Sequence, residues 1–257
     1  MTIRTDAERL LSLHEASDLL TVVNVWDAVS AATVAAEPGT TALATASHSI
    51  AATFGYDDGE NIPLDLHLEM IARIVAVSPV PVSADLEAGY GDVGETVRRA
   101  IGVGVVGANI EDQLKPLDEA VRGVEAAMRA GEAEGIRFVL NARTDAFVRG
   151  RDRSPEENLA DAVTRGRAYL DAGAPVVFVP GLLDEHQVTT LVDAFGPQRL
   201  TMIGVPGSLP LARLQELGVA RVSYGPWSQR VALTALQDLV RDVSAGGGIP
   251  EGTRPLN

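Results

Sequence analysis

Two acidic residues stand one position apart at the end of an apolar run in the segment SADLEAGYGD, residues 83–92. Asp85 and Glu87 point to the same side of an extended strand, because successive side chains of a strand alternate. Two carboxylates this close repel each other unless a cation or strong hydrogen-bond donors hold them. The pair therefore indicates a place where negative charge serves a chemical purpose.

Other apolar runs end in the same way. Glu111 lies at the end of the run GVVGANIED (104–112), and Arg143 lies near the end of RFVLNARTD (137–145). Strand parity turns Glu111 inward, so that carboxylates from adjacent strands converge beside a guanidinium. Oxygen ligands without a histidine partner suit Mg²⁺ or Mn²⁺ rather than zinc. A salt-bridge network between Arg143 and the acids is the structural alternative, and it stays open.

The elements that must position these residues are visible as eight apolar segments, mostly short and continuous, as strands buried on both faces should be. They cover residues 19–27, 40–47, 80–87, 104–112, 137–145, 174–181, 199–207 and 219–226. Helix-length stretches lie between most of them, and one begins with a capping box at Ser154 and Glu157.

This alternation predicts an α/β fold, a (β/α)₈ TIM barrel, whose active site lies at the carboxyl ends of the strands. A doubly wound open sheet is the alternative. We expect a single barrel domain over residues 1–243, with an amphipathic helix from the segment DAERLLSLHEA at its floor. Residues 244–257 are expected to form a flexible tail.

Composition excludes several functions. The 257 residues carry a formal net charge of −14 and no cysteine. Such a chain has no general affinity for nucleic acid or anionic membranes, and it has no disulfide, thiolate metal site or thiol nucleophile. Apolar residues make up 46% but aromatic residues only 4%, so the core should be aliphatic. Without a run of membrane-spanning length or a basic, apolar leader, we expect a soluble, cytoplasmic protein.

Several motifs resemble those of one enzyme superfamily. DLEAGYGD, GANIEDQ and LNARTDAF, with NVWDAVSA, ASHSIAATFGYDD and LDAGAPVVFVPG, are similar to the motifs of the isocitrate lyase/phosphoenolpyruvate mutase superfamily, in the same order. The resemblance runs from about residue 20 to about residue 230 and points to a branch near the phosphonomutase-like and oxaloacetate hydrolase or decarboxylase members. It implies a barrel that binds Mg²⁺ and a small 2-oxo acid or its enolate.

The resemblance also implies a metal site and an assembly. Asp85 would contact the metal directly, whereas Glu87 and Glu111 would hold it largely through water. The protein would be a homodimer or homotetramer, in which the last helix, around residues 229–243, packs on the barrel of a neighbouring subunit.

Substrate-binding roles follow from the same resemblance. Ala46, Ser47 and His48 would form the turn that receives the substrate carboxylate. Arg143 would pair with the anionic end of the substrate, and Asp58 matches a catalytic aspartate near the metal.

Other polar and aromatic residues have two interpretations. His48, at a strand end, could transfer a proton or make only a structural contact. Trp26 could line the substrate pocket or simply pack, and Tyr90 could donate a hydrogen bond into the pocket or pack on its loop. Asp27 can cap the helix that follows it. The remaining histidines are expected to be solvated or to cap helices: His14, His67 and His186.

Three glycine-containing segments also need an interpretation. GVGVVG (102–107) matches the dinucleotide fingerprint, but a helix precedes it and a strand follows, which is the reverse of the required order. GVPGS (204–208) and SYGP (223–226) end the last two strands, and they could bind phosphate or form plain turns.

One departure from the superfamily narrows the function. The lyases carry a Lys-Lys-Cys-Gly-His loop after the fourth strand, and the phosphonate enzymes an Asn-containing loop, but this chain reads EDQLKPLDEAVRG there. We expect a Mg²⁺-dependent lyase or hydrolase that cleaves a C–C bond of a small 2-oxo or 2-hydroxy dicarboxylic acid, with oxaloacetate-like compounds first. The alternatives are a C–P bond enzyme for a phosphonopyruvate-like substrate and a barrel that binds 2-oxo acids without turnover.

Overall fold

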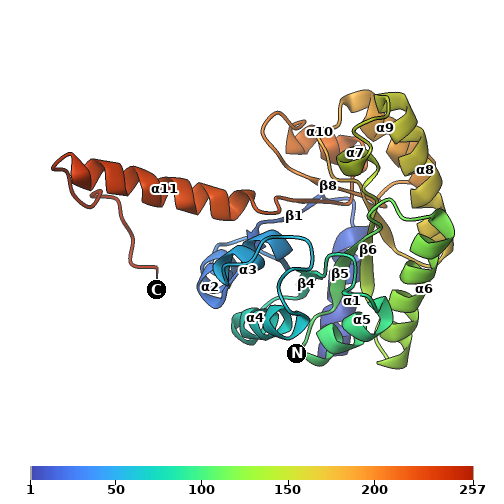
Figure 1. Cartoon of the computed structure of the whole chain (residues 1–257), viewed down its shortest axis with the longest axis horizontal. Helices are drawn as coiled ribbons and strands as arrows, with labels where there is room; N and C mark the ends of the chain where they lie inside the picture. Colours follow the sequence, from blue (N-terminus) through green and yellow to red (C-terminus); the bar gives the residue numbers. More distant parts are fainter. Residues whose placement is uncertain (1, 257) are drawn as a thin grey trace.

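The strands of the computed structural model, which describes residues 2–256, form one parallel sheet that curls into a nearly closed barrel with helices around it (Figure 1). The nine strands within this range are β1 (Leu20–Val22), β2 (Asn24–Val25), β3 (Leu43–Thr45), β4 (Val82–Asp85), β5 (Gly107–Glu111), β6 (Val139–Arg143), β7 (Val176–Phe178), β8 (Leu200–Ile203) and β9 (Arg221–Ser223). The parallel α/β barrel expected from the sequence is thereby confirmed.

Eleven helices occur among residues 2–256. They are α1 (Ile3–Glu15), α2 (Ala28–Ala35), α3 (Ser47–Thr53), α4 (Leu64–Val77), α5 (Val93–Gly102), α6 (Leu117–Ala133), α7 (Ala146–Arg149), α8 (Pro155–Asp171), α9 (Glu185–Phe195), α10 (Leu211–Glu216) and α11 (Trp227–Ser244). The capping box of α8 is present, with Ser154 accepting from the Glu157 amide, and Asp27 caps α2 in the same manner.

The first strand segment closes the barrel by changing neighbours. The sequence predicts one strand over 19–27, but the structure divides it at Val23 into β1 and β2. β1 pairs with β9 and β2 pairs with β3, so these two short strands stand at opposite ends of the sheet order. Val23 alone joins β1 to β2, so the backbone connects the two edge strands of the sheet covalently.

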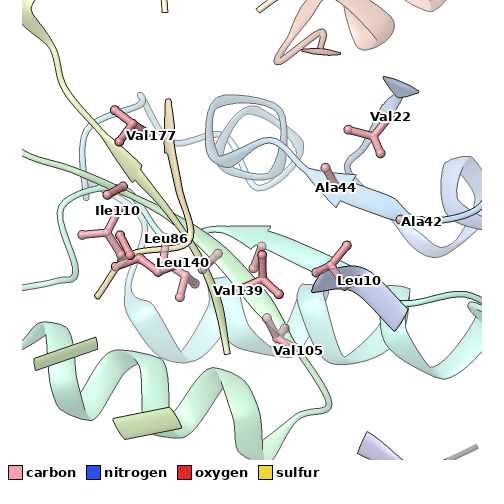
Figure 2. Close-up of a cluster of buried hydrophobic side chains, with 14 of the residues drawn as sticks. Leu10, Val22, Ala42, Ala44, Leu86, Val105, Ile110, Val139, Leu140 and Val177 are labelled. Carbon is pink, nitrogen blue, oxygen red and sulfur yellow. The ribbon is translucent and has the colours of Figure 1, made fainter. Parts of the chain in front are cut away.

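Helix α1 covers the amino ends of the strands, which we call the floor of the barrel. A Cβ built on Gly107, the first residue of β5, would lie 2.8 Å from Leu10 Cδ2 and 2.7 Å from the carbonyl oxygen of Val139. Only glycine fits this close approach. Figure 2 shows Leu10 beside Val105 and Val139 in the buried aliphatic cluster, as the composition predicts.

Two histidines contradict the sequence interpretation. His14 is 1% exposed and His67 is 0% exposed, so the expectation that they are solvated or capping is wrong. His14 lies on the inward face of α1, four residues after Leu10, and its Nδ1 is 2.8 Å from the Leu10 carbonyl oxygen. Burial, helped by the charge of Arg221, lowers the pKa of His14 to about 3, and burial lowers that of His67 to about 4. Neutral imidazoles are far easier to bury than charged ones.

Helix α11 leaves the barrel and extends away from it (Figure 1). Gln229 is its buried residue, whereas apolar side chains stay exposed along its length: Val231, Leu233, Leu236, Val240 and Val243. After Ser244, residues 245–256 contain no helix or strand. Within residues 2–256, no helix is both long and apolar enough to cross a membrane.

Candidate active site

A cavity of about 760 Å³ opens at the carboxyl ends of the strands, which we call the mouth of the barrel. Five residues predicted from the sequence line it: Ser47, Asp58, Glu87, Glu111 and Arg143. The rest of its lining is Gly59, Gln113, Leu114, Val148, Arg149 and Arg151. The ends of β3, β4, β5 and β6 supply these residues directly or through the loops that follow. This is the end of a parallel barrel at which catalytic groups gather.

Asp85, the last residue of β4, is held by the first residue of α3. The backbone N–H of Ser47 donates to Asp85 Oδ2 at 3.1 Å, and the Ser47 hydroxyl donates to the same oxygen at 2.8 Å. Both donors fix one carboxylate oxygen, and Oδ1 keeps its lone pairs for another partner. The turn at Ala46–Ser47 therefore orients Asp85 in this structure.

Glu87 is 4% exposed and sits where two loops meet. Its Oε1 accepts from the Tyr90 hydroxyl at 3.0 Å, and its Oε2 accepts from the backbone N–H of Glu60. Because Tyr90 donates to Glu87, His67 Nδ1, 2.7 Å from the Tyr90 oxygen, must be the donor in that contact. Burial, opposed by the Glu60 bond and strengthened by the charge of Asp85, raises the pKa of Glu87 to about 7.

Glu111 ends β5 between two guanidinium groups. Arg143 Nη1 lies 2.8 Å from Glu111 Oε2, and Arg149 Nη2 lies 3.6 Å from Glu111 Oε1. Arg143 Nε also pairs with the fully buried Asp145 at 2.8 Å. Burial raises the pKa of Glu111 to about 7, although the charge of Arg143 opposes this shift. The ion-pair alternative considered for the sequence is thus present in part.

Asp58 and His48 face each other at the rim. His48 Nδ1 lies 3.5 Å from Asp58 Oδ2, and both side chains are about half exposed. The Ser47 hydroxyl is 3.3 Å from Asp58 Oδ1. Since that hydroxyl has one proton and is closer to Asp85, Asp58 keeps free lone pairs toward the cavity. An imidazole beside a carboxylate is a pair of groups that can pass a proton between them.

The donor set fits a hard divalent cation. Asp58, Glu87 and Glu111 line the cavity with Arg143, Arg149 and Arg151, while Asp85 and Asp145 contact Ser47 and Arg143 of this lining. Among residues 2–256, no three His, Cys, Asp or Glu side chains form a ready-made cage for an ion. Mg²⁺ does not need one, because it keeps several waters and uses one or two carboxylates.

Four residues expected to bind the substrate do not line this cavity: Trp26, Ala46, His48 and Tyr90. Ala46 is buried beneath it, and His48 contacts Asp58 beside it. Trp26 lines a separate, mainly apolar depression together with Val29 and Ala232. The Tyr90 hydroxyl points at Glu87 and His67, so Tyr90 supports a carboxylate here.

In the turns at the ends of β8 and β9, backbone amides donate hydrogen bonds to side chains of the protein itself. The Val205 amide donates to Ser208 Oγ at 3.0 Å, and the Tyr224 and Gly225 amides donate to Asn24 Oδ1 at 2.7 and 2.8 Å. A phosphate would have to displace these partners, so the geometry favours plain turns.

Sequence reasoning missed several residues of the site. Gln113 and Arg149 line the cavity, and Glu60 contacts Glu87 from a loop. Gln113 stands two positions after Glu111, and this spacing was a usable signal. Arg149 and Glu60 had none, because they reach the site from α7 and from an irregular loop whose path only tertiary structure defines.

Comparison with known proteins assigns the family. The family described as phosphoenolpyruvate phosphomutase matches residues 10–244. An uncharacterised protein of Mycobacterium tuberculosis is 30% identical over 93% of this chain and 90% of its own length. Oxaloacetate decarboxylase from Paraburkholderia xenovorans is 30% identical over 94% of this chain and 83% of its own. Phosphonopyruvate hydrolase from a Variovorax species is 25% identical over 79% and 74%.

Solved structures agree with this assignment. A Burkholderia cenocepacia protein described as a presumed phosphonomutase is 38% identical, covers 93% of this chain and 99% of its own, and superposes with a TM-score of 0.87. Oxaloacetate acetylhydrolase in complex with oxalate is 26% identical, covers 98% and 91%, and superposes with a TM-score of 0.85. This protein therefore belongs to the phosphoenolpyruvate mutase/isocitrate lyase superfamily, whose members cleave C–C or C–P bonds of 2-oxo acids.

Proposed function

We propose that this protein is a Mg²⁺-dependent enzyme that cleaves a C–C bond of a small 2-oxo or 2-hydroxy dicarboxylic acid through an enolate, with an oxaloacetate-like compound as substrate. The observation that carries the proposal is the mouth cavity, where Ser47, Asp58, Glu87, Glu111 and Arg143 come together from different strand ends. The likeness to oxaloacetate decarboxylase and oxaloacetate acetylhydrolase supports this choice of substrate.

Asp85 would hold the cation directly through its free Oδ1, while Glu87 and Glu111 would hold it through water. Mn²⁺ would suit the same oxygen ligands. When bound, the cation supplies positive charge that stabilises the negative charge developing on the 2-oxo group as the bond breaks.

The protein's own residues bind and orient the substrate. The turn at Ala46–His48 would receive its carboxylate, and Arg143 would pair with its anionic end. Glu111 and Asp145 hold the Arg143 guanidinium in a fixed plane, which suits bidentate recognition. Asp58 and His48 would move the proton, because Asp58 lines the cavity and the half-exposed His48 contacts it.

A C–P bond substrate is the second candidate. Phosphonopyruvate has the same 2-oxo acid half, and a Variovorax phosphonopyruvate hydrolase is among the relatives. Three arginines line the cavity, and guanidinium groups recognise phosphonate as well as carboxylate.

A barrel that binds 2-oxo acids without turnover is the third candidate. The segment after β5 is short, since α6 already begins at Leu117. Within it, the buried Asp112 carboxylate turns away from the cavity and accepts from Tyr169 at 2.6 Å and Arg165 at 3.1 Å. Gln113 and Leu114, the residues of this segment that line the cavity, have no ionisable proton, so proton transfer would fall to Asp58 and His48.

Steady-state turnover with Mg²⁺ separates the three candidates. Oxaloacetate hydrolysis gives oxalate and acetate, decarboxylation gives pyruvate and carbon dioxide, and phosphonopyruvate hydrolysis gives pyruvate and phosphate. We expect product from oxaloacetate that EDTA abolishes and Mg²⁺ restores. Phosphate release alone would favour the second candidate, and tight binding of oxalate without turnover of any acid would favour the third.

The proposal includes an oligomer assembled through α11. Another subunit would cover the exposed apolar residues of α11, such as Leu236, and the exposed Val23 between β1 and β2. Light scattering at micromolar concentration should give a dimer or tetramer mass, and Leu236→Glu should lower it. A monomer in the unchanged protein would contradict this assembly.

A further inference from the structure

Two loops of the mouth hold each other through an exchange of hydrogen bonds. Loop 54–63 connects α3 to α4 and carries Asp58, and loop 86–92 connects β4 to α5 and carries Glu87. The Glu60 backbone N–H donates to Glu87 Oε2, and the Tyr90 backbone N–H donates to Glu60 Oε1 at 2.6 Å. Each loop thus supplies a carboxylate to an amide of the other, and we call this pair of bonds the loop bridge.

The loop bridge is anchored more firmly on loop 86–92 than on loop 54–63, where Asp58 also contacts Ser47 at 3.3 Å and His48 at 3.5 Å. The Tyr90 hydroxyl also bonds to Glu87, and His67 on α4 bonds to that hydroxyl, so the end of the bridge on loop 86–92 is buried and fixed. Residues 54–59, by contrast, are all exposed. Between Asp58 and the buried Ile62, Glu60 supplies the bonds that join the loop to the barrel.

The backbone at the loop bridge is in an unfavourable conformation. Glu60, Glu87 and Tyr90 have φ angles of 62°, 52° and 51°, in the left-handed region that glycine usually occupies. Such conformations persist only where surrounding interactions over-determine them, and they concentrate at functional sites. All three residues that form the bridge bonds show this feature.

We propose that Glu60 is a positioning residue, which fixes loop 54–63 so that Asp58 stands over the metal-side carboxylates. Glu60 itself touches neither substrate nor reacting atoms, and it acts through the Tyr90 amide and Glu87. Its side chain contributes one acceptor oxygen, so the acceptor matters and the charge does not. This inference rests on the proposed function only where it concerns turnover.

The test uses three substitutions of the full-length protein and a control on the same loop. Glu60→Ala and Glu60→Gly remove the acceptor, and the glycine variant also removes the backbone strain. Glu60→Gln keeps an acceptor oxygen without the charge. Asp57→Ala removes the same charge from an exposed neighbour and is the control.

Amide hydrogen exchange provides the readout that does not depend on activity. In the alanine and glycine variants, the hydrogen-bonded amides of Tyr90, Glu60 and Tyr56 should exchange about tenfold or more faster. Exchange in Glu60→Gln and Asp57→Ala should match the unchanged protein. Unaltered exchange in both acceptor-free variants, or equal acceleration in Glu60→Gln, would overturn the inference.

Kinetics provides the second readout. With oxaloacetate and Mg²⁺, kcat should fall about 10- to 100-fold in the alanine and glycine variants, while KM should change by less than about threefold. Glu60→Gln should restore kcat to within about threefold of the unchanged protein. A lowered kcat without faster exchange would also overturn the inference. If the unchanged protein turns over no 2-oxo acid, the proposed function fails, and the exchange experiment still decides the role of Glu60.

Discussion

The mouth and the floor of the barrel differ in how often a residue other than glycine adopts a left-handed φ. Turns at the floor that need a left-handed φ mostly use glycine, as at Gly104 and Gly173, with φ of 98° and 100°. Of six non-glycine residues with positive φ among residues 2–256, five lie in mouth loops: Glu60, Glu87, Tyr90, Gln113 and Leu114. Gln198 at the floor has a φ of 56°, and the mouth glycines Gly59 and Gly89 have φ of 92° and 91°, so the difference is one of proportion. The mouth more often accepts strain in order to keep a side chain in place.

The two ends also differ in how they bury polar groups. At the floor, His14 is buried in the neutral form against α1 and the aliphatic cluster. At the mouth, Glu87 and Glu111 are buried as acids whose charge needs a cation or a guanidinium. The floor is therefore built for stability and the mouth for binding charge, and each of the following experiments tests this contrast.

The largest effect is expected at the mouth from Asp85→Ala. Removing the proposed direct ligand should abolish stabilisation by Mg²⁺ and lower turnover by about 1000-fold, since a catalytic cation contributes several kcal/mol to the transition state. The fold should survive, because one of several mutually repelling acids is lost. Thermal melting with and without Mg²⁺ measures the stabilisation, and an activity assay measures the turnover. Asp193→Ala, an exposed acid of α9, is the control. Normal Mg²⁺ stabilisation of the Asp85 variant would refute the site.

Arg143→Lys should have the next largest effect. Lysine cannot reproduce a bidentate, planar contact, so oxalate binding with Mg²⁺ should weaken by about 1.5–3 kcal/mol. Arg143 also pairs with Glu111 and Asp145, so some loss of stability should accompany this. Isothermal titration and a melting curve separate the two losses, with the exposed Arg122→Lys of α6 as control. Lost stability with unchanged binding would make Arg143 purely structural.

These residues show how far sequence could lead. Strand ends are readable because buried strands are continuous and apolar, and strand parity turns Asp85 and Glu111 inward. Glu87 lies beyond β4 with a φ of 52°, so its loop places it, and the expectation that it continues the alternation of the strand is wrong. The ion pairs of Arg143 were foreseen only as an alternative, because choosing between a substrate and two nearby acids needs distances. The division of the first strand at Val23 was unreadable, because it depends on which neighbours each half finds.

Loops and buried polar groups were the weakest part of the prediction. Glu60 reaches Glu87 through a backbone amide, and backbone bonds leave no mark on residue identity. His14 carried a signal that went unused, since it lies one helical turn after the buried Leu10 on the same face of α1. A polar residue type favours an exposed position, whereas the spacing of His14 from Leu10 indicates the buried one that the structure shows.

At the floor, Gly107→Ala should destabilise the fold without affecting ligand binding. Its new Cβ would meet a backbone oxygen and Leu10, and overpacking of this kind costs about 1–3 kcal/mol. Gly102→Ala on α5, where a Cβ meets nothing within 4 Å, should instead stabilise slightly, by about 0.4–1 kcal/mol. Urea unfolding and oxalate titration of both variants check this. Weaker oxalate binding by Gly107→Ala would show that the floor and the mouth are coupled.

The smallest effect is expected in the pH dependence of the free energy of unfolding of the unchanged protein. Titration of Glu111 at the mouth and of His14 at the floor changes this free energy in opposite directions. The pKa of Glu111 is raised to about 7 in the folded state, so between about pH 4.5 and 7 the folded state binds more protons than the unfolded chain. Stability from this group is complete at low pH and falls as pH rises through that window. The pKa of His14 is lowered to about 3, so between about pH 3 and 6.5 the unfolded chain binds more protons, and stability from this group rises with pH.

Single substitutions should separate these opposing contributions. In metal-free buffer, Glu111→Gln should make the free energy of unfolding rise more steeply from pH 5 to pH 6.5, by up to about 2 kcal/mol, because the carboxyl group no longer titrates. His14→Asn should change the slope by a similar amount in the other direction. Urea unfolding at both pH values measures the slopes, and overall loss of stability in either variant cancels from the comparison. If both substitutions change the slope of the unfolding free energy against pH in the same direction, Glu111 and His14 do not contribute with opposite signs. Added Mg²⁺ should restore stability at pH 6.5 in the unchanged protein far more than at pH 5, because the cation competes with protons only at the mouth.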